Sequence, residues 1–480
     1  MREIMKFYID GQWVGPKGSR VCDVINPATE GVAGRMVMGE KEDVDCAVAA
    51  AWRAFDSYSR TSMEERLRLL QRIDACFQAR IPDLASAITE EMGCPAWLVE
   101  KAQIPISAAH IKIAIEALKS YRFEENRGTT LIRREPIGVC GLITPWNWPV
   151  ALIFTKVLPA IATGCTLVLK PSEYAPFSAS ITAEIMDAAG VPPGVFNLVN
   201  GDGPTVGAAL SGHPDVDMLS ITGSVRAGVD VARNAAATVK RVHQELGGKS
   251  PNIILADADL EKSVTSGVSF MMLNSGQSCS APSRMLAPRS RMAEVIAIAR
   301  SVAEATTVGP PDSGAYVGPV VNARQWDRVQ GLIRKGIEEG ATLVAGGPGR
   351  PAGLERGYYV RPTVFADVTN DMTIAREEIF GPVLVIIGYD DVEDAIRIAN
   401  DTNYGLAAYV HAGSTEKAAA VGSRIRAGQV YLNGDIDLLD PYIPFGGFKH
   451  SGNGREWGDF GFEAFLEVKS YLGRNPPQAG

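Results

Sequence analysis

A cysteine in an unusually polar setting is the first candidate for chemistry in this chain. Cys279 lies in NSGQSCSAPSR (residues 274–284), where its neighbours are small or polar. Reactive thiols occupy partly exposed, polar positions of this kind, whereas most free cysteines are small buried hydrophobic residues. The adjacent glycine, glutamine and serines offer backbone amides and little apolar cover. We therefore expect a reactive, accessible thiol, with a structural cysteine as the alternative.

Two polar residues next to apolar runs could assist such a thiol. Glu245 begins ELGGKSPN (245–252) between two strand-like runs, as either a general base or an ordinary turn carboxylate. Asn147 lies in TPWNWP (144–149) directly after the apolar run 138–143. That position is the carboxyl end of a predicted strand, where α/β proteins place ligands. Its amide could donate to a developing oxyanion or cap the next helix.

Three further turns follow predicted strands and suit a nucleotide. Lys170 and Glu173, in LVLKPSE, could bind ribose hydroxyl groups. Gly223 and Gly228, in ITGSVRAG, frame a strand-to-helix turn that suits a pyrophosphate at a helix N-terminus. NGDGPTVG (200–207) is another glycine-rich turn. None of them is a GxGxxG motif, so each is a weak signal taken singly.

The elements that would position these residues follow from the spacing of apolar side chains. Residues 41–119 predict helices, with Thr61 and Ser62 ahead of Glu64 and Glu65 as an N-terminal capping pattern. From about residue 138, short apolar runs alternate with helices near 151–163 and 176–189, which predicts a parallel sheet. A second such series has strands near 252–255, 341–345, 384–388, 407–411 and 429–432 and helices near 259–273, 291–305, 322–339 and 415–425.

Two extended segments have no obvious place in either series. They are NRGTTLIRREP (126–136) and EAFLEVKSYLG (463–473), both rich in residues that favour strands. They could be partners across a subunit interface, or a pair of local hairpins.

Composition narrows the class of protein. The 480 residues exceed what one hydrophobic core supports, so two or more domains are expected. The net charge is −8 (47 basic minus 55 acidic residues), which makes nucleic acid and anionic membranes poor partners. No apolar run approaches a membrane span, and the N-terminus predicts a strand and turn, so we expect a cytoplasmic protein. The seven cysteines form no CxxC pair and the five histidines no HxxxH pair, so no metal site is expected.

Taken together and in this order, the motifs resemble the aldehyde dehydrogenase superfamily over essentially the whole chain. The resemblance implies an α/β fold with a Rossmann-like NAD-binding domain (1–119 and 138–246), a second α/β catalytic domain (247–445) and a small β oligomerisation arm (120–137 and 462–475). It also implies a homo-oligomer, either a dimer or a tetramer. The motifs are YIDGQWV, TPWNWP, KPSE, ITGS, ELGGKSP, GQSC, EEIFGPV and PFGGFKHSGNGRE (444–456), with 34 residues separating Glu245 from Cys279 (279 − 245).

The resemblance also implies roles for individual residues. Cys279 is similar to the nucleophile, Asn147 to the oxyanion-hole asparagine and Glu245 to the general base, and Lys156 corresponds to a lysine buried below the site. Glu378 matches a carboxylate at the nicotinamide ribose, Phe380 an aromatic residue near that ring and Ser224 a serine near the pyrophosphate. The full set expected to bind the cofactor is Ile143, Thr144, Pro145, Trp146, Lys170, Ser172, Glu173, Gly203, Gly207, Gly223, Ser224, Leu246, Gly247, Glu378 and Phe380.

The expected reaction is oxidation of an aldehyde to a carboxylic acid through a thioester on Cys279. The presence of Glu245 favours hydrolysis of that thioester over transfer to coenzyme A. Glu173 favours NAD, with NADP possible, because a carboxylate repels a 2′-phosphate. An idle family member that only binds ligands remains an alternative. The expected substrate is an aromatic or medium-chain aliphatic aldehyde or a catabolic semialdehyde, with Trp148, Leu152, Thr155, Ser278, Ser280, Leu438 and Phe445 as its lining.

Overall fold

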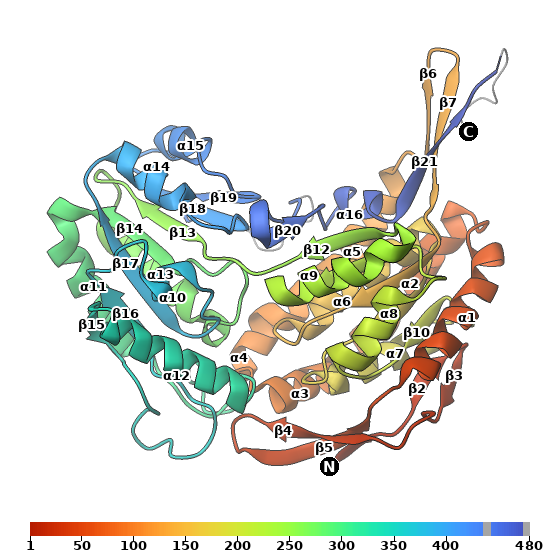
Figure 1. Cartoon of the computed structure of the whole chain (residues 1–480), viewed down its shortest axis with the longest axis horizontal. Helices are drawn as coiled ribbons and strands as arrows, with labels where there is room; N and C mark the ends of the chain where they lie inside the picture. The colour runs from red at the N-terminus through yellow and green to blue at the C-terminus, as the bar shows by residue number, and fades with distance from the viewer. Residues whose placement is uncertain (435–442, 474–480) are drawn as a thin grey trace.

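The computed structural model describes residues 1–434 and 443–473, in which two α/β units lie side by side and a narrow β arm projects from one of them (Figure 1). The first unit contains an eight-stranded sheet whose five central strands are parallel and whose edge strands are antiparallel. Its order is β20 (Gly452–Asn453), β12 (Arg241–Glu245), β11 (Met218–Thr222), β8 (Val139–Ile143), β9 (Thr166–Lys170), β10 (Phe196–Leu198), β2 (Phe7–Ile9) and β3 (Gln12–Val14).

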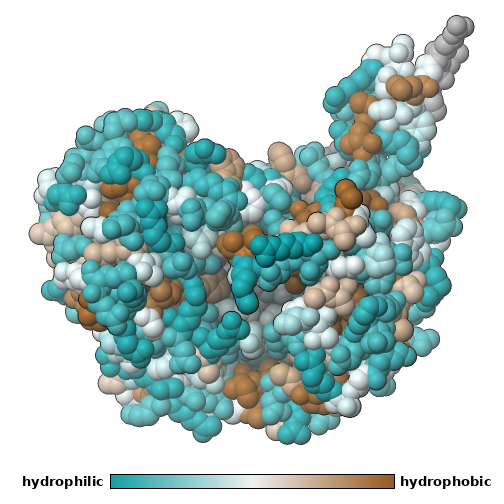
Figure 2. Space-filling model, viewed as in Figure 1, coloured by the Kyte–Doolittle hydropathy of each residue, from teal (hydrophilic) through white to brown (hydrophobic). Residues whose placement is uncertain are grey.

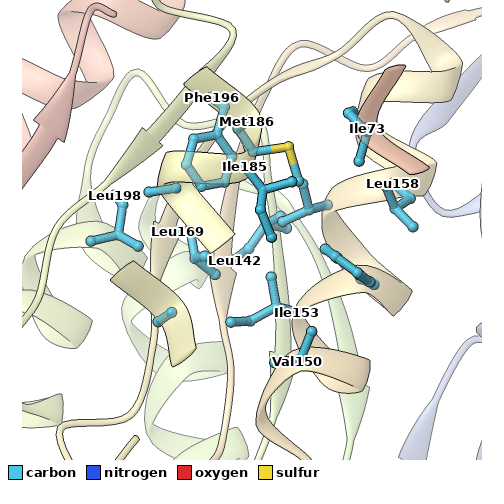
Figure 3. Close-up of a cluster of buried hydrophobic side chains, with 14 of the residues drawn as sticks. Ile73, Leu142, Val150, Ile153, Leu158, Leu169, Ile185, Met186, Phe196 and Leu198 are labelled. Atoms are coloured by element: carbon cyan, nitrogen blue, oxygen red, sulfur yellow. The ribbon is translucent and has the colours of Figure 1, made fainter. Parts of the chain in front are cut away.

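Helices cover both faces of this sheet because alternate residues of its strands point to opposite sides. In β9, Leu167 and Leu169 pack into one hydrophobic cluster, while Val168 between them belongs to another. The first cluster also contains side chains of α2 (Met63–Ala79), α3 (Ile81–Met92), α5 (Ile104–Ser120), α6 (Pro149–Thr163) and α7 (Pro176–Ala188), and part of it is drawn in Figure 3. The second contains side chains of α1 (Lys41–Tyr58), α8 (Ala208–Gly212) and α9 (Val225–Ala235).

The second unit is built on a seven-stranded sheet that is parallel except for its edge strand β15. The order is β15 (Thr342–Ala345), β16 (Thr363–Ala366), β17 (Val383–Tyr389), β14 (Arg284–Pro288), β13 (Pro251–Ile254), β18 (Ala407–His411) and β19 (Gln429–Leu432). One face packs against α10 (Leu260–Met272) and α11 (Met292–Ala305), and the other against α12 (Ala323–Glu338), α14 (Val392–Asn400) and α15 (Thr415–Gly422).

The projecting arm joins the two extended segments of the sequence within one chain. Strands β6 (Glu124–Arg127) and β7 (Thr130–Pro136) form a hairpin, and β21 (Leu466–Tyr471) pairs antiparallel with β7. The segments are therefore neither two separate hairpins nor partners that need a second subunit to pair. A further small sheet contains β1 (Arg2–Ile4), β5 (Gly31–Val37) and β4 (Val21–Asn26).

The secondary structure agrees closely with the pattern of the sequence. The predicted mixed α/β class and the parallel sheets with crossover helices are confirmed. The capping pattern is also present, since Ser62 Oγ accepts from Glu65 N and the Glu65 carboxylate accepts from Ser62 N. Two strands of the second sheet, β14 and β16, were not predicted.

Candidate active site

A cavity of about 640 Å³ lies where the carboxyl end of the first sheet faces the second unit. Its walls come from the turn after β8, the turn between β11 and α9, the loop after β12, the Cys279 loop and α12. The lining residues are Pro145, Trp146, Asn147, Tyr174, Thr222, Gly223, Ser224, Val225, Arg226, Leu246, Gly247, Cys279, Asn322, Arg324, Gln325, Arg328, Glu377, Glu378, Phe380 and Tyr404.

The loop that presents Cys279 begins with a left-handed turn. Asn274, Ser275 and Gly276 have φ angles of 52°, 57° and 71°, a conformation that is uncommon for residues with side chains. A Cβ on Gly276 would lie 2.1 Å from the carbonyl oxygen of Gly381, so only glycine fits there. This strained turn ends α10 and directs the following residues toward the cavity.

Hydrogen bonds lock the Asn147 segment to the Cys279 loop. The Asn147 carbonyl accepts from Gln103 Nε2 (3.1 Å) and Asn274 Nδ2 (3.0 Å). The Asn147 side chain donates from Nδ2 to the carbonyl of Gln277 (3.0 Å). An amide nitrogen carries two hydrogens, so one remains for a ligand in the cavity. The buried Asn147 is therefore held by its backbone and positioned to donate beside Cys279.

The thiol of Cys279 is not a ready-made thiolate. Cys279 is partly exposed in the cavity, yet burial and then the carboxylates of Glu378 and Glu245 raise the pKa of its thiol to about 12. The surrounding protein and the two acidic groups therefore favour the neutral thiol over the thiolate in this state. Exposure does not single out this cysteine either, since Cys46 is exposed and Cys22 and Cys76 are also partly exposed.

Glu245 lies at the end of β12, behind the wall of the cavity, and is only 2% exposed. Both of its carboxylate oxygens are buried without a hydrogen-bond partner in the part of the chain that the structure describes. Burial raises its pKa well above the usual value, and Glu456 raises it further, while Lys156 and Arg455 oppose the rise. The alternative that Glu245 is an ordinary carboxylate of a surface turn is thus excluded. A buried carboxylate with a raised pKa can accept a proton.

Lys156 is fully buried in α6 and takes part in a polar network below the cavity. Its ammonium forms an ion pair with Glu456 and donates to Ser220 Oγ (3.1 Å). Ser220 Oγ in turn lies 3.1 Å from His243 Nδ1. Lys156 is absent from the cavity wall, so it is placed to act through its neighbours.

The residues predicted for the nicotinamide end of a cofactor meet in the cavity. Trp146 and Phe380 are in edge-to-face contact with ring centroids 5.5 Å apart, and Phe380 has an unusual positive φ of 58°. Glu378 Oε1 accepts from Gly248 N (3.0 Å), and burial raises the Glu378 pKa to about 7. A Cβ on Gly247 would lie 2.1 Å from Glu378 Oε2, so this close approach requires glycine. Also in the lining are the predicted Pro145, Gly223, Ser224 and Leu246.

The other predicted cofactor residues lie outside the lining of this cavity. Lys170 is buried at the end of β9, where Nζ donates to the carbonyls of Pro171 and Gly201 (2.8 Å each) and lies 3.6 Å from Glu173 Oε2. Glu173 is adjacent to Tyr174, which does line the cavity. Ile143, Thr144 and Ser172 are buried, a Cβ on Gly207 would lie 3.8 Å from Lys170 Cδ, and Gly203 begins the short helix 203–207.

Two of the predicted substrate residues, Trp148 and Ser278, are next to Asn147 and Cys279 in the chain. Trp148 Nε1 donates to Ser278 Oγ (3.1 Å), and the partly exposed Leu152 follows on α6. Thr155 is buried, and its hydroxyl donates to the Leu152 carbonyl (3.1 Å). Phe445 stacks on Trp457 at 4.9 Å. Leu438 lies outside the described residues.

An aromatic cluster beside Cys279 was not predicted. Tyr409 and Tyr431 stack at 4.8 Å, and Phe270 meets Tyr409 edge to face at 5.7 Å. Tyr409 OH donates to the carbonyl of Ser280 (2.9 Å), and Cys279 is among the groups that raise the pKa of both tyrosines. These residues belong to strands β18 and β19 and to α10, and their spacing carries no signal of a binding site.

Three cationic residues in the cavity were also missed. Arg226 lies in the first turn of α9, and Arg324 and Arg328 lie on α12. Together with the helix N-terminus, these guanidinium groups suit the negative charge of a pyrophosphate. Arg284, by contrast, is fully buried and donates to the backbone carbonyls of Lys249, Ile398 and Ala399, so it is not available to a substrate.

The described residues contain no cluster of histidine, cysteine and acidic side chains that could hold a metal ion. Within the same part of the chain, every helix is too short or too polar to cross a membrane.

The geometry brings a cysteine and an asparagine amide together in the wall of one cavity, with a buried carboxylate behind that wall. Residues 13–471 match the model of the aldehyde dehydrogenase family, and the chain belongs to this family. The predicted family and the predicted aldehyde dehydrogenase enzyme are confirmed. The chain is 57% identical, over 98% of its length and 99% of the relative's, to 3-succinoylsemialdehyde-pyridine dehydrogenase from a Pseudomonas species.

Solved structures agree with this assignment. A cysteine-to-alanine mutant of aldehyde dehydrogenase C from Pseudomonas syringae, in complex with NAD⁺ and octanal, matches with a TM-score of 0.97 and 53% identity over 99% of this chain and 98% of that one. An aldehyde dehydrogenase from Mycobacterium tuberculosis in complex with NAD⁺ matches with a TM-score of 0.96 and 42% identity over 99% of each chain.

Proposed function

We propose that this protein oxidises an aldehyde to a carboxylic acid with NAD⁺, through a thioester on Cys279. The observation that carries the proposal is the placement of Cys279 and Asn147 in one cavity with Trp146, Glu378 and Phe380. The apolar rings, the free amide hydrogen and the arginines of this cavity fit a nicotinamide dinucleotide. When bound, NAD⁺ supplies a hydride acceptor.

Each step then falls to a residue of this chain. Because burial and two carboxylates hold the Cys279 thiol neutral, a base must take its proton, and we assign this role to Glu245, a nearby group with a raised pKa. The sulfur attacks the aldehyde carbon, and the Asn147 amide and the Cys279 backbone N–H donate to the oxyanion. Collapse of the oxyanion expels the hydride and leaves a thioester. After Glu245 has released this first proton to solvent, its carboxylate removes a proton from water, and the resulting attack cleaves the thioester to the acid and frees the sulfur.

The substrate we propose is an aromatic aldehyde or a semialdehyde that carries a ring, with medium-chain aliphatic aldehydes also accepted. The rings of Phe270, Tyr409 and Tyr431 beside Cys279 favour a flat apolar group, because aromatic pairs stack or meet edge to face. The names of the two similar proteins, a pyridine semialdehyde dehydrogenase and an enzyme bound to octanal, agree with this range.

The remaining features of the proposal concern cofactor choice, organisation and location. Glu173 favours NAD over NADP, because its carboxylate would accept from a 2′-hydroxyl and repel a 2′-phosphate. Residues 1–119 and 138–246 would form the cofactor domain and 247–445 the catalytic domain. The arm would form the interface of a homo-oligomer. Its outer strands β6 and β21 are edges, Val468 and Leu472 are 65% and 80% exposed, and Figure 2 has hydrophobic surface on it. A cytoplasmic location stays a prediction.

The test is NADH formation over a panel of aromatic, aliphatic and carboxylated aldehydes, with acid and acyl-coenzyme A analysed as products. We expect the wild type to turn over at least one aldehyde and to release free acid whether or not coenzyme A is present. Cys279→Ala should form neither NADH nor acid. Cys46→Ala, which removes an exposed thiol from α1, serves as the matched control and should behave as the wild type. Oxidation by Cys279→Ala at the wild-type rate would contradict the covalent mechanism, and acyl-coenzyme A as the main product would contradict hydrolysis.

A further inference from the structure

A buried histidine with a free polar atom lies beside Glu245. His243 and Glu245 are two residues apart on β12, so their side chains lie on the same face of the sheet. His243 Nε2 lies 3.6 Å from Glu245 Oε1. Within the described residues, this nitrogen and both oxygens of Glu245 are buried and have no hydrogen-bond partner. Three unpaired polar atoms therefore face one another, and a shift of a few tenths of an ångström would close a hydrogen bond.

The direction of this hydrogen bond follows from the network behind His243. An ammonium group only donates, so Ser220 Oγ accepts from Lys156 Nζ at 3.1 Å. The hydroxyl hydrogen of Ser220 is then left for His243 Nδ1, also 3.1 Å away. With Nδ1 as acceptor, a neutral imidazole carries its hydrogen on Nε2, the atom that faces Glu245. The network thus forms a chain of donors that runs from Lys156 through Ser220 and His243 to Glu245.

The surroundings of the ring keep it neutral. Burial, and then the charges of Lys156 and Arg455, lower the His243 pKa to about 3. Glu456 on the segment after β20 lies 3.9 Å from Nδ1, and Glu245 lies on the other side of the ring. A Cβ on Gly454 would lie 2.1 Å from His243 Cδ2, so the backbone there packs directly on the ring and fixes its plane. A neutral, immobile donor is therefore presented to Glu245.

We propose that His243 is a positioning residue for the general base, which donates from Nε2 to one oxygen of Glu245 and leaves the other oxygen free for water. The inference rests on the proposed function and names a further residue for its hydrolytic step. A hydrogen bond to the ionised carboxylate favours that form and offsets part of the effect of burial. His243 neither gains nor loses a proton in this role.

The choice of variant depends on a second cavity, of about 410 Å³, which His243 lines together with Arg241, Asn453 and Arg455. A smaller residue at position 243 would let water from this cavity reach Glu245 and replace the lost donor. His243→Phe keeps an apolar ring in place without a donor, whereas His243→Gln keeps a donor near the position of Nε2. His213→Asn, at a half-buried histidine paired with Asp45 far from the cavity, is the control.

The experiment follows hydrolysis of p-nitrophenyl acetate, which acylates a reactive thiol without any cofactor. The burst of p-nitrophenol reports acylation, and the later steady rate reports hydrolysis of the acyl-enzyme. We expect the acid limb of the steady rate to move up by about one pH unit in His243→Phe, a tenfold loss of rate on that limb, with the burst amplitude unchanged. The limb should return to its original position in His243→Gln and stay there in His213→Asn.

Two further variants separate this role from a purely structural one. In the Glu245→Gln background, which has no carboxylate to tune, His243→Phe should leave the pH profile unchanged. Ser220→Ala, which removes the hydroxyl that orients the ring, should move the limb in the same direction by less, and it provides the test if His243→Phe does not fold. An unchanged limb in His243→Phe or Ser220→Ala overturns the inference. The absence of a burst in the wild type overturns the proposed covalent function, and this inference with it.

Discussion

Two buried glutamates in this enzyme differ in one respect, and the difference separates structure from chemistry. Glu91 on α3 and Glu245 on β12 are 1% and 2% exposed, and burial raises the pKa of each. The carboxylate of Glu91 accepts from the backbone N–H groups of Phe177 and Ser178 and from the Ser178 hydroxyl at the start of α7. The carboxylate of Glu245 has no such partner in the described part of the chain.

The comparison teaches that burial and a shifted pKa do not by themselves identify a catalytic acid or base. Glu91 satisfies the free N–H groups at a helix N-terminus, a structural role that carboxylates perform throughout proteins. Glu245 is left with open hydrogen-bonding capacity, which is costly in a folded core and is typical of a functional group. The predictions below test this contrast from its largest expected effect to its smallest.

The largest effect is expected from Glu245→Gln. Loss of the base should lower the rate of acid formation by about 10² to 10⁴-fold, because general base catalysis typically contributes that much. Stability should not fall, since a neutral amide costs less to bury than an unpaired carboxylate. The measurements are steady-state turnover and thermal unfolding of the same preparation, with Glu91→Gln as the matched control. A control variant as slow as Glu245→Gln would erase the distinction between the two carboxylates.

In its hydrogen bonding, Asn147 is intermediate between Glu91 and Glu245. One hydrogen of its side-chain amide is donated to the Gln277 carbonyl, and the other is free. Asn147→Ala should reduce turnover by about 10² to 10³-fold, the usual effect of removing one oxyanion donor. Binding of NAD⁺, followed by quenching of protein fluorescence, should change little. If cofactor affinity falls as steeply as turnover, Asn147 holds the loop together and does not act on the oxyanion.

Much of this arrangement could be predicted from the sequence, for a physical reason. Asn147 and Glu245 follow directly on strands, and short apolar runs with polar ends mark both the strand and the place where parallel strands gather their ligands. The extended character of the two arm segments is also visible in the sequence, whereas their pairing with each other within one chain is not. These features are strands and the residues that directly follow them, and the periodicity of apolar side chains predicts such local structure.

The missed features depend on contacts between distant segments. Arg324 and Arg328 lie on the polar face of an amphipathic helix, where arginine is ordinary, and only the packing of α12 brings them to the cavity. Strand β14 begins with the buried Arg284, and a charged residue is not expected in a buried strand. The carbonyls that accept from Arg284 belong to distant segments, so the sequence pattern does not reveal them. The raised pKa of the Cys279 thiol likewise depends on distant segments, since Glu245 and Glu378 reach the thiol only through folding.

Glu91→Ala tests whether Glu91 has a purely structural role. The substitution leaves Phe177 N, Ser178 N and Ser178 Oγ buried without an acceptor, which should lower the free energy of unfolding by about 2–4 kcal/mol. The rate per folded molecule should stay within about twofold of the wild type, because Glu91 does not line the cavity. Urea unfolding and active-site titration give the two quantities, and a specific activity that falls with stability unchanged would place Glu91 in the catalytic apparatus.

The smallest effect concerns pH, and it follows from the raised pKa of Glu91. The carboxyl of Glu91 has a pKa raised to about 8 by burial, whereas in the unfolded chain it titrates near 4.5. Between these values the folded state binds one proton more than the unfolded state, so the free energy of unfolding falls as pH rises, by at most about 1.4 kcal/mol per pH unit. Glu91→Gln cannot titrate and should show a flatter dependence. The measurement is the urea midpoint between pH 6.5 and 8, where the buried histidines do not titrate in the folded state. Equal slopes in the two proteins would mean that the hydrogen bonds from α7 keep Glu91 ionised in spite of its burial.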